Sequence, residues 1–264
     1  MSKSSKSNPK KDKLPEISAI IITKNEEDNI SDCLASVAWC DEIIVVDSGS
    51  TDNTIELCRK YTNKILVTDD WPGFGIQKKR ALEKATSEWV LSIDADERVT
   101  KALEQEIKQT IGNCKQSSFR VPRQSSYCGR VIKHSGWSPD YVTRLFRQDS
   151  ACFSDDIVHE KVEVLHGVTG TFKAPLQHYP FDSLEQVLEK INAYSSSNAL
   201  KSYTQKIDSS LFKAVSHGIW AFINTYIFRA GFLDGREGFI LAVSSAEVCY
   251  YRYIKLLYLH QNNS

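Results

Sequence analysis

Three short apolar runs in the first hundred residues constrain the fold of this chain more than any other feature. They cover residues 17–23, 42–47 and 89–94. Runs of this length and apolarity are typical of parallel strands that are buried on both faces. Predicted helices lie between them, over residues 30–37 and 75–85. Because strand and helix alternate at this spacing, we expect right-handed βαβ units and a mainly parallel sheet.

Each of the three runs ends in side chains that can bind a ligand. The first stops at Thr23 and Asn25, the second at Asp47, and the third at Asp94 and Asp96. The carboxyl ends of parallel strands meet at one edge of a sheet, where open α/β folds bind their ligands. Carboxylates there supply the hard oxygen donors that suit Mg²⁺ or Mn²⁺ carrying a substrate diphosphate. An isolated Asp-x-Asp is more often a solvated turn, so the convergence of three strand ends carries the argument.

The composition is that of an ordinary globular protein. Of the 264 residues, 41% are hydrophobic and 25% are charged, and the formal net charge is zero. A neutral chain gives no reason to expect nucleic acid as a partner. The seven cysteines form no C-x-x-C pair. This pattern indicates neither a zinc site nor a disulfide framework, and it fits a reducing, cytoplasmic compartment.

Changes in sequence character divide the chain into three parts. Residues 1–14 are polar and lysine-rich, and we predict a disordered basic tail there rather than a secretory signal. Residues 15–182 hold the strand–helix pattern followed by a loop-rich stretch, which together predict one catalytic domain. The pattern over residues 183–264 is helical and predicts a separate C-terminal region.

The C-terminal helical region raises the question of membrane contact. Over residues 211–228 the large apolar side chains share one helical stripe, while Lys213, His217 and Asn224 lie opposite. Such a helix suits the plane of a membrane interface better than a span. The aromatic and basic run at 250–255 has the composition of an anchor at headgroup level. We therefore predict a peripheral membrane protein; the alternative is that these helices pack on each other or on the catalytic domain.

The order of four segments resembles the family-two glycosyltransferases with the GT-A fold. These segments read AIIITKNEE, EIIVVDSGSTDNT, GFGIQKKRAL and WVLSIDADE. Three later segments, GWSPDYVTRLFR, FSDDIVHEKVEV and FLDGREGF, resemble the branch that adds a sugar to the inner core of lipopolysaccharide. The resemblance implies an α/β fold of the GT-A type, with a mixed, mainly parallel sheet flanked by helices and a helical C-terminal extension.

The resemblance also implies roles for the residues at the strand ends. The positions that match nucleotide-sugar contacts are Thr23, Asn25, Glu26, Asp47, Lys78 and Asp94. Among them, Asp47 would accept a hydrogen bond from the uracil imide, and Asp94 would lie beside the ribose. Asp96 matches the ligand of a metal ion on the diphosphate. The sequence departs from the family pattern at Lys78, where many members have Arg, and at Glu97, where many have a third Asp.

Sugar transfer needs a divalent cation to stabilise the leaving diphosphate and a base to take the proton of the acceptor hydroxyl. The segment FSDDIVHEKVEV supplies a dense cluster of candidates. We predict Glu160 or Asp156 as the base, and His159 as a metal ligand or as the residue that orients the base. Arg144 and Arg147 are predicted to grip phosphate on the donor or the acceptor. One base that directs attack from the opposite face implies inversion at the anomeric carbon.

We therefore expect a metal-dependent, inverting glycosyltransferase that moves a hexose, with glucose as the first candidate, from a UDP-sugar to a lipid-linked core oligosaccharide. It would act at the cytoplasmic face of the inner membrane. Two alternatives stay open: a polyprenyl-phosphate or protein glycosyltransferase of the same fold, and a catalytically silent module that binds nucleotide sugars. Metal-dependent hydrolysis of the donor would separate the silent module from the enzymes.

Overall fold

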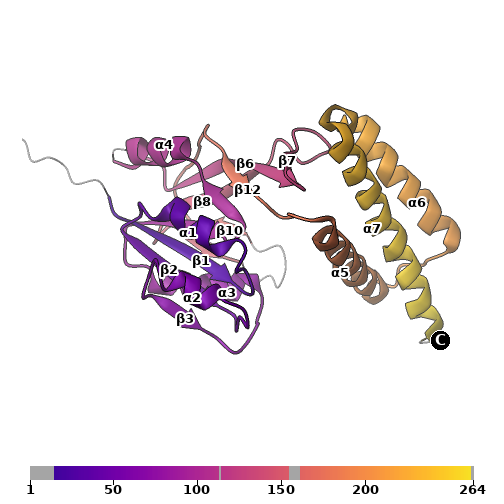
Figure 1. The fold of residues 1–264 in the computed structure, drawn as a ribbon, viewed down its shortest axis with the longest axis horizontal. Coiled ribbons are helices and arrows are strands. Elements are labelled where there is room, and N and C mark those ends of the chain that lie inside the picture. Colours follow the sequence, from indigo (N-terminus) through magenta and orange to yellow (C-terminus); the bar gives the residue numbers. More distant parts are fainter. Residues whose placement is uncertain (1–14, 113, 155–160, 263–264) are drawn as a thin grey trace, which may run out of the picture. The chain divides into compact units, whose positions relative to one another are not determined.

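The computed structural model describes residues 15–112, 114–154 and 161–262, and the chain divides into two compact units (Figure 1). Unit 1 takes the residues up to Val121 together with Thr143–Ala174. Unit 2 takes Pro122–Val142 together with Pro175 onward. The predicted tail at 1–14 lies outside the described residues. The observed division also differs from the predicted boundary at residue 182, because a segment of the loop-rich stretch groups with the C-terminal helices.

Unit 1 is built on a mixed, mainly parallel sheet. Its strands follow the order β3-β2-β1-β4-β8-β6, and the division into units falls within the last two strands, so that residues 141–142 of β8 and 122–127 of β6 count with unit 2. The pairs β1–β2, β1–β4 and β2–β3 are parallel, whereas β8 runs antiparallel to β4. The bounds are β1 (Ile17–Thr23), β2 (Glu42–Asp47), β3 (Ile65–Val67), β4 (Trp89–Asp94), β6 (Ser118–Tyr127) and β8 (Tyr141–Arg147). The fold class that the sequence predicted is therefore confirmed.

Helices flank this sheet, and their apolar sides complete its core. The helices are α1 (Ile30–Val37), α2 (Thr54–Cys58), α3 (Phe74–Lys84) and α4 (Lys101–Ile111). Four short strands belong to the same unit: β5 (Glu97–Val99), β9 (Ala151–Phe153), β10 (Val162–Val164) and β11 (Thr169–Thr171). Side chains from the parallel strands, such as Ile20 and Ile44, pack in one cluster with Phe146 of β8 and Phe153 of β9. This core holds the strand ends rigidly.

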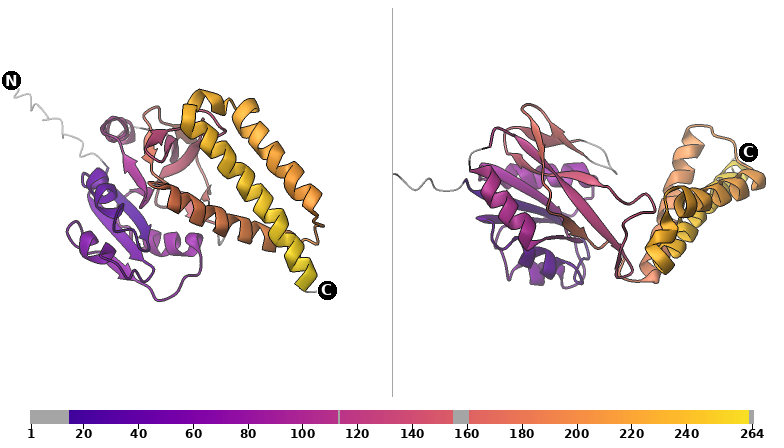
Figure 2. Two further views of the ribbon diagram at one scale, coloured as in Figure 1. Left: turned by 45° about the vertical axis from the view of Figure 1, so that its right-hand side comes forward. Right: turned by 90° about the horizontal axis from the view of Figure 1, so that it is seen from above.

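Unit 2 consists mainly of helices around a small apolar core. Its elements are β7 (Arg130–Val131), β12 (Leu176–His178), α5 (Leu184–Thr204), α6 (Leu211–Ile223), a π-helical turn (Asn224–Phe228), a 3₁₀ turn (Gly231–Asp234) and α7 (Gly235–Asn262). Helix α7 packs against both α5 and α6 (Figure 2). The core joins Tyr127 and Ile132 to Val187, Ile191 and Leu241. The hairpin segment before residue 142 is thus anchored to helices that follow much later in the chain.

The first three turns of helix α6 bury small side chains against α7 and leave most large apolar ones exposed. Ala214 and Gly218 are buried, and a Cβ atom on Gly218 would lie 3.4 Å from the carbonyl oxygen of Ala246. The large apolar side chains point outward, so that Phe212 is 80% exposed and Ile219 is 57% exposed. The predicted apolar stripe therefore exists, but only its first part is exposed: the rings of Phe222 and Tyr226 each lie 5.5 Å from the ring of Phe239 in α7.

The basic run at 250–255 behaves differently from the prediction. The Arg252 guanidinium donates from its Nε and Nη2 atoms to the Ser202 hydroxyl, and Lys255 Nζ lies 2.7 Å from Asn192 Oδ1 and 2.8 Å from Ser195 Oγ. Both cations therefore tie α7 to α5, which corrects their assignment as headgroup anchors. Among the residues that the structure describes, no helix combines the length and apolarity of a membrane span.

Candidate functional site

The carboxyl ends of β1, β2 and β4 bring three predicted site residues side by side. In the parallel register, Thr23 pairs with Asp47 across β1 and β2. The neighbouring residue Ile22 pairs with Asp94 across β1 and β4. The apolar runs fix this register because a slip of one residue would turn every buried side chain to the opposite face. Polar side chains therefore lie together at the edge of the sheet where the apolar runs of β1, β2 and β4 end.

Two buried cations hold the Asp94 carboxylate from either side. Lys78 Nζ, from α3, lies 2.7 Å from Asp94 Oδ1. The Arg144 guanidinium, from β8, contacts the other oxygen of Asp94 and also lies 2.6 Å from Glu97 Oε1. Glu97 accepts a further hydrogen bond of 3.1 Å from the backbone N–H of Asp94. These four side chains form one network of two cations and two anions, which we call the Asp94 network.

The Asp94 network stays ionised because its charges support one another. Burial alone would raise the pKa of Asp94, but Arg144 and Lys78 outweigh that effect and hold this pKa well below its usual value. Burial likewise acts to lower the pKa of Arg144, while Asp94 and Glu97 raise it above the ordinary arginine value. The Asp94 side chain is still 30% exposed. A ligand hydroxyl could therefore reach a carboxylate that is already fixed in place.

Asp96 lies in the turn between β4 and β5, where it is half-buried. Arg98 fixes this turn, since its guanidinium donates to the carbonyl oxygen of Ala95 at 2.8 Å and to Asn29 Oδ1 at 3.1 Å. We did not predict a role for Arg98 from the sequence, because its partner Asn29 is 69 residues away. The sequence feature that could have indicated this role is a basic residue directly after an acidic turn.

The residues of the turn fit a cation that a diphosphate brings with it. Within the described part of the chain, no three His, Cys, Asp or Glu side chains gather as a ready-made metal cage. Mg²⁺ in phosphate-binding sites characteristically uses one or two protein carboxylates, and substrate phosphates and waters complete its shell. Asp96, which is half-buried in this turn, can supply such a carboxylate.

The loops after β1 and β2 are bound to each other by their own polar groups. Asn25 adopts a left-handed backbone conformation with φ of 54°, and its Oδ1 accepts from the backbone N–H of Thr51 at 2.8 Å. The backbone N–H of Asn25 donates to Ser50 Oγ, and that of Glu26 donates to Thr54 Oγ1, both at 2.8 Å. Asn25 and Glu26 thus shape the edge of the sheet even without a ligand.

Thr23 differs from its neighbours because its hydroxyl is unsatisfied. The residue is 4% exposed, and Thr23 Oγ1 has no hydrogen-bond partner among the residues that the structure describes. A buried hydroxyl without a partner is uncommon and calls for an explanation such as a bound ligand. Its position at the end of β1 places this free group directly beside Asp47.

Asp47 is buried, and its carboxylate organises the loop that follows β2. Asp47 Oδ1 accepts from the backbone N–H groups of Gly49 and Ser50 at 3.0 and 2.8 Å, and its other oxygen accepts from the Ser50 hydroxyl. The predicted contact between Asp47 and a uracil ring remains a prediction. The structure adds a second role, since removing this carboxylate would also loosen the loop.

Two residues of α3 tie the loops after β2 and β3 together, and the sequence analysis missed both. Gln77 Nε2 donates to Ser48 Oγ at 2.8 Å and to Thr68 Oγ1 at 2.7 Å. The Arg80 guanidinium binds both carboxylate oxygens of Asp70, at 2.6 and 2.7 Å. Gln77 and Arg80 are three residues apart and therefore share a helix face. This spacing could have indicated from the sequence that they act together.

The structure separates the two arginines that the sequence analysis grouped. Residues three apart on a strand point to opposite faces, so Arg144 and Arg147 of β8 cannot grip one phosphate together. Arg147 pairs with Glu88 and lies 4.7 Å from the ring centroid of Trp89. Trp89 begins β4, roughly 16 Å along the strand from Asp94 at its end. We therefore leave Arg147 out of the candidate site.

Glu160, Asp156 and His159, the predicted base and metal ligand, lie outside the described residues. The chain on either side of them is well anchored, however. The backbone N–H of Ser154 donates to the carbonyl oxygen of Lys161 at 3.0 Å. Phe153, which precedes Ser154, has its ring centroid 6.0 Å from Lys78 Nζ. The described chain thus comes close to the Asp94 network at Phe153.

Comparisons with known proteins agree on one family. Residues 18–173 match the sequence profile of Glycosyl transferase family 2. The chain is 30% identical to the lipopolysaccharide core biosynthesis glycosyltransferase LpsC of Rhizobium meliloti over 94% of each chain. It is 31% identical to an uncharacterized glycosyltransferase of Rickettsia prowazekii, over 92% of this chain and 87% of that protein.

One solved structure is similar across nearly the whole chain. The crystal structure of Staphylococcus aureus TarS residues 1–349 in complex with UDP covers 93% of this chain and 92% of its own, with 18% identity and a TM-score of 0.50. At this level of identity, the similarity concerns the fold.

Proposed function

Because the chain belongs to glycosyl transferase family 2, we propose that it moves a hexose from a UDP-sugar to the core oligosaccharide of a lipid-linked acceptor. The observation that supports a donor site most directly is the edge where Thr23, Asp47 and Asp94 lie together. The unsatisfied Thr23 hydroxyl and the fixed Asp94 carboxylate there offer hydrogen bonds to a nucleoside. The complex of TarS with UDP supports uridine as the nucleoside of the donor.

In this proposal each residue of the edge has a separate task. Asp47 accepts from the uracil imide, and Thr23 and Asn25 border the nucleoside. Asp94 accepts from a ribose hydroxyl, while Lys78 and Arg144 keep it ionised and in position. Since all four charges of the Asp94 network are held before the donor arrives, binding would need little reorganisation of the protein.

We propose that Asp96, with His159, holds Mg²⁺ or Mn²⁺ on the diphosphate. The cation would supply charge stabilisation to the leaving diphosphate as the anomeric bond breaks. The part that this chain plays is to present one carboxylate at a turn that Arg98 keeps rigid. Glu160 or Asp156 would take the proton from the acceptor hydroxyl, and attack opposite the leaving group would invert the anomeric carbon.

The acceptor and the location are proposed from the second half of the chain. The similarity to LpsC, named for lipopolysaccharide core biosynthesis, supports a core oligosaccharide on a lipid anchor. The outward apolar side chains of α6 support a peripheral position at the cytoplasmic face of the inner membrane. A protein that lies on the membrane surface meets a lipid-linked acceptor where that lipid is concentrated.

This proposal is tested by assaying the full chain, with Mg²⁺ or Mn²⁺, for hydrolysis and transfer with a panel of sugar nucleotides and lipid acceptors. We expect hydrolysis of one UDP-hexose, loss of activity with excess chelator, and transfer to truncated core lipid. Transfer to a polyprenyl phosphate or a peptide instead would move the protein to the alternative acceptor classes. Absence of both hydrolysis and transfer, with UDP still bound, would identify a silent binding module.

A further inference from the structure

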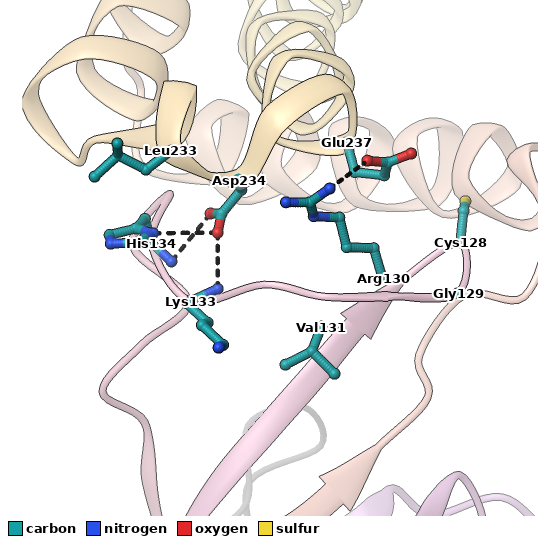
Figure 3. Close-up of a pocket in the computed structure, with 9 residues that line it drawn as sticks. All are labelled: Cys128, Gly129, Arg130, Val131, Lys133, His134, Leu233, Asp234 and Glu237. Carbon is teal, nitrogen blue, oxygen red and sulfur yellow. Dashed lines mark hydrogen bonds and ion pairs between the residues drawn. The ribbon is translucent and has the colours of Figure 1, made fainter.

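Unit 2 contains a pocket that the donor site does not use. It has a volume of about 690 Å³ and lies between the β7 hairpin and the 3₁₀ turn that precedes α7 (Figure 3). The hairpin contributes Arg130, Lys133 and His134, and the start of the helix contributes Leu233, Asp234 and Glu237. All of these residues belong to unit 2.

The two walls of the pocket are held together by Asp234, which makes four hydrogen bonds to the hairpin. Its carboxylate accepts from the backbone N–H groups of Lys133 and His134, both at 3.0 Å. It also accepts from Ser135 Oγ at 2.9 Å, and it lies 3.2 Å from His134 Nδ1. Asp234 belongs to the segment FLDGREGF, and Ser135 directly precedes GWSPDYVTRLFR. The segment FLDGREGF therefore meets the residue that directly precedes GWSPDYVTRLFR at this pocket.

The glycines of FLDGREGF allow the close packing that shapes the pocket. A Cβ atom on Gly238 would lie 2.0 Å from the carbonyl oxygen of Gly231, which no side chain could tolerate. Gly235 has a φ of 69°, in the left-handed region that favours glycine. The start of α7 is thus fixed against the 3₁₀ turn by backbone contact.

The acids of the pocket accept several hydrogen bonds, and one of its two hairpin cations, Lys133, extends away from them. Burial acts to raise the pKa of Asp234, but its hydrogen bonds from Lys133, Ser135 and His134 lower this pKa below its usual value. The buried Glu237 accepts from Arg236 Nε and Nη2 at 2.9 and 2.7 Å. The half-exposed Arg130 side chain forms a long ion pair with Glu237, with 3.6 Å between Arg130 Nη1 and Glu237 Oε2. The exposed Lys133 side chain points away from Asp234 (Figure 3). Among the described residues, no acid pairs with the Lys133 ammonium.

Exposed apolar side chains lie on the pocket wall and in the chain segments that precede it. Leu233 on the pocket wall and its neighbour Phe232 are both exposed. Trp220 and Phe228 are exposed as well, and their ring centroids lie 5.6 Å apart. Cations beside an apolar surface match a ligand that has an anionic head and a hydrocarbon tail.

We infer that this pocket binds the phosphate group of a membrane lipid, with Arg130 and Lys133 as its cationic contacts. The inference rests on the membrane location in the proposed function, but it does not depend on the donor or on sugar transfer. It assigns unit 2 a binding site of its own, in which the apolar residues enter the interface and the hairpin cations receive the headgroup.

Flotation of the full chain with vesicles tests this inference. The probes are phosphatidylcholine vesicles with and without phosphatidic acid. The pocket variant carries Arg130→Gln and Lys133→Gln, and the single Lys133→Gln variant changes only an exposed side chain. A matched control carries Lys201→Gln and Lys206→Gln, which remove the same charge from exposed positions elsewhere in unit 2. Thermal unfolding of each variant checks that it is folded.

We expect the pocket variant to bind phosphatidic acid vesicles about thirtyfold more weakly, and the control about threefold or less. Lys133→Gln alone should give an intermediate loss. Equal losses in the pocket and control variants would show general surface electrostatics and overturn the inference. If the wild-type chain binds inorganic phosphate in solution but binds phosphatidic acid vesicles no more tightly than phosphatidylcholine vesicles, the site takes free phosphate and the lipid assignment is overturned.

The test separates this inference from the proposed function. If the wild-type chain binds no vesicles at all, both the pocket assignment and the membrane location fail. If the pocket variant binds phosphatidic acid vesicles more weakly than the control variant while no sugar nucleotide is hydrolysed, the lipid site stands and the proposed reaction fails.

Discussion

The two units break the usual rule of burial in opposite directions. Unit 1 buries large charged side chains at the Asp94 network, whereas unit 2 exposes large apolar side chains along α6 and buries small ones. In most proteins charged groups stay at the surface and aliphatic or aromatic groups fill the core. Each inversion lies where we propose a ligand, the nucleotide in unit 1 and lipid in unit 2. Departures from the most stable arrangement are expected at functional sites.

The energetic cost differs between the two inversions. Buried ion pairs lose hydration, and their mutual attraction seldom exceeds that loss by much, so the Asp94 network is weak as a source of stability. It is nevertheless costly to break, because one missing partner leaves an unpaired buried charge. An exposed apolar side chain on α6 costs the folded state little. Substitutions in the two regions should therefore have opposite signatures.

Arg144→Met should produce the largest loss of stability and would test the comparison most severely. The change leaves Asp94 and Glu97 together without their shared cation, which costs about 3–5 kcal/mol of unfolding free energy. Arg147→Met is the matched control on the same strand, because its pair with Glu88 is partly exposed and contributes at most about 1 kcal/mol. Urea denaturation measures both. Similar losses in the two variants would contradict the description of a buried, mutually dependent network.

Asp96→Ala should separate activity from stability within unit 1. Loss of a metal ligand is expected to lower kcat a hundredfold to a thousandfold, roughly 3–4 kcal/mol of transition-state stabilisation. The unfolding free energy should change by less than about 1 kcal/mol, since Asp96 is half-buried in a turn. Asp69→Ala, an exposed acid on the loop after β3, serves as the control. Turnover like that of the wild type in folded Asp96→Ala protein would remove Asp96 from the site.

Asp47→Asn is expected to weaken donor binding more than it slows the chemical step. A charge-assisted hydrogen bond contributes about 1.5–3 kcal/mol, so KM for the donor should rise about tenfold or more, with kcat much less changed. Steady-state kinetics with the donor varied gives both constants. A fall in kcat alone would place Asp47 in the chemistry rather than in nucleotide binding.

The pH dependence of stability should report on Asp94. Since the pKa of Asp94 in the folded state is depressed, its stabilising effect is complete above the unfolded pKa of about 3.9 and is lost as the pH falls toward the folded value. One extra bound proton corresponds to about 1.4 kcal/mol of unfolding free energy per pH unit. Urea denaturation between pH 5 and pH 3 should therefore show a shallower decline for Asp94→Asn than for the wild type. Asp70→Asn is the control, because solvent screens its exposed pair with Arg80.

Substitutions on the outer side of α6 should have the smallest effect on stability. Phe212→Ser with Ile219→Ser should change the unfolding free energy by about 0.5 kcal/mol or less per site and should weaken vesicle flotation. Gly218→Val, on the side that faces α7, should cost about 1–3 kcal/mol because a larger side chain has no space there. A large loss of stability from the outer substitutions would show that these residues are packed after all.

The sequence predicted the sheet edge well because burial on both faces leaves little ambiguity. The bounds of β1 and β2 match the predicted runs residue for residue, and α1 matches as well. The order of these elements also placed Thr23, Asp47 and Asp94 at one edge. Short-range patterns were sufficient for this part of the molecule.

Features that depend on distant partners could not be read from the pattern. Arg144 and Arg147 looked alike in the sequence, and only pairing with β4 distinguished the one beside Asp94 from the one beside Trp89. The apolar stripe of α6 was visible, but the pattern did not show that its first part is exposed while Phe222 and Tyr226 pack against Phe239 of α7. The cations at Arg252 and Lys255 looked like membrane anchors until their contacts with α5 were known.

The contact between Asp234 and the β7 hairpin has a consequence for how the protein is made. Asp234 is 101 residues later in the chain than its partner Lys133. At a synthesis rate of about 5–20 residues per second, the hairpin waits roughly 5–20 s for its carboxylate. Unit 1, whose last segment ends at Ala174, is fully translated during that interval. The donor half of the molecule can therefore fold on the ribosome while the hairpin is still exposed to chaperones.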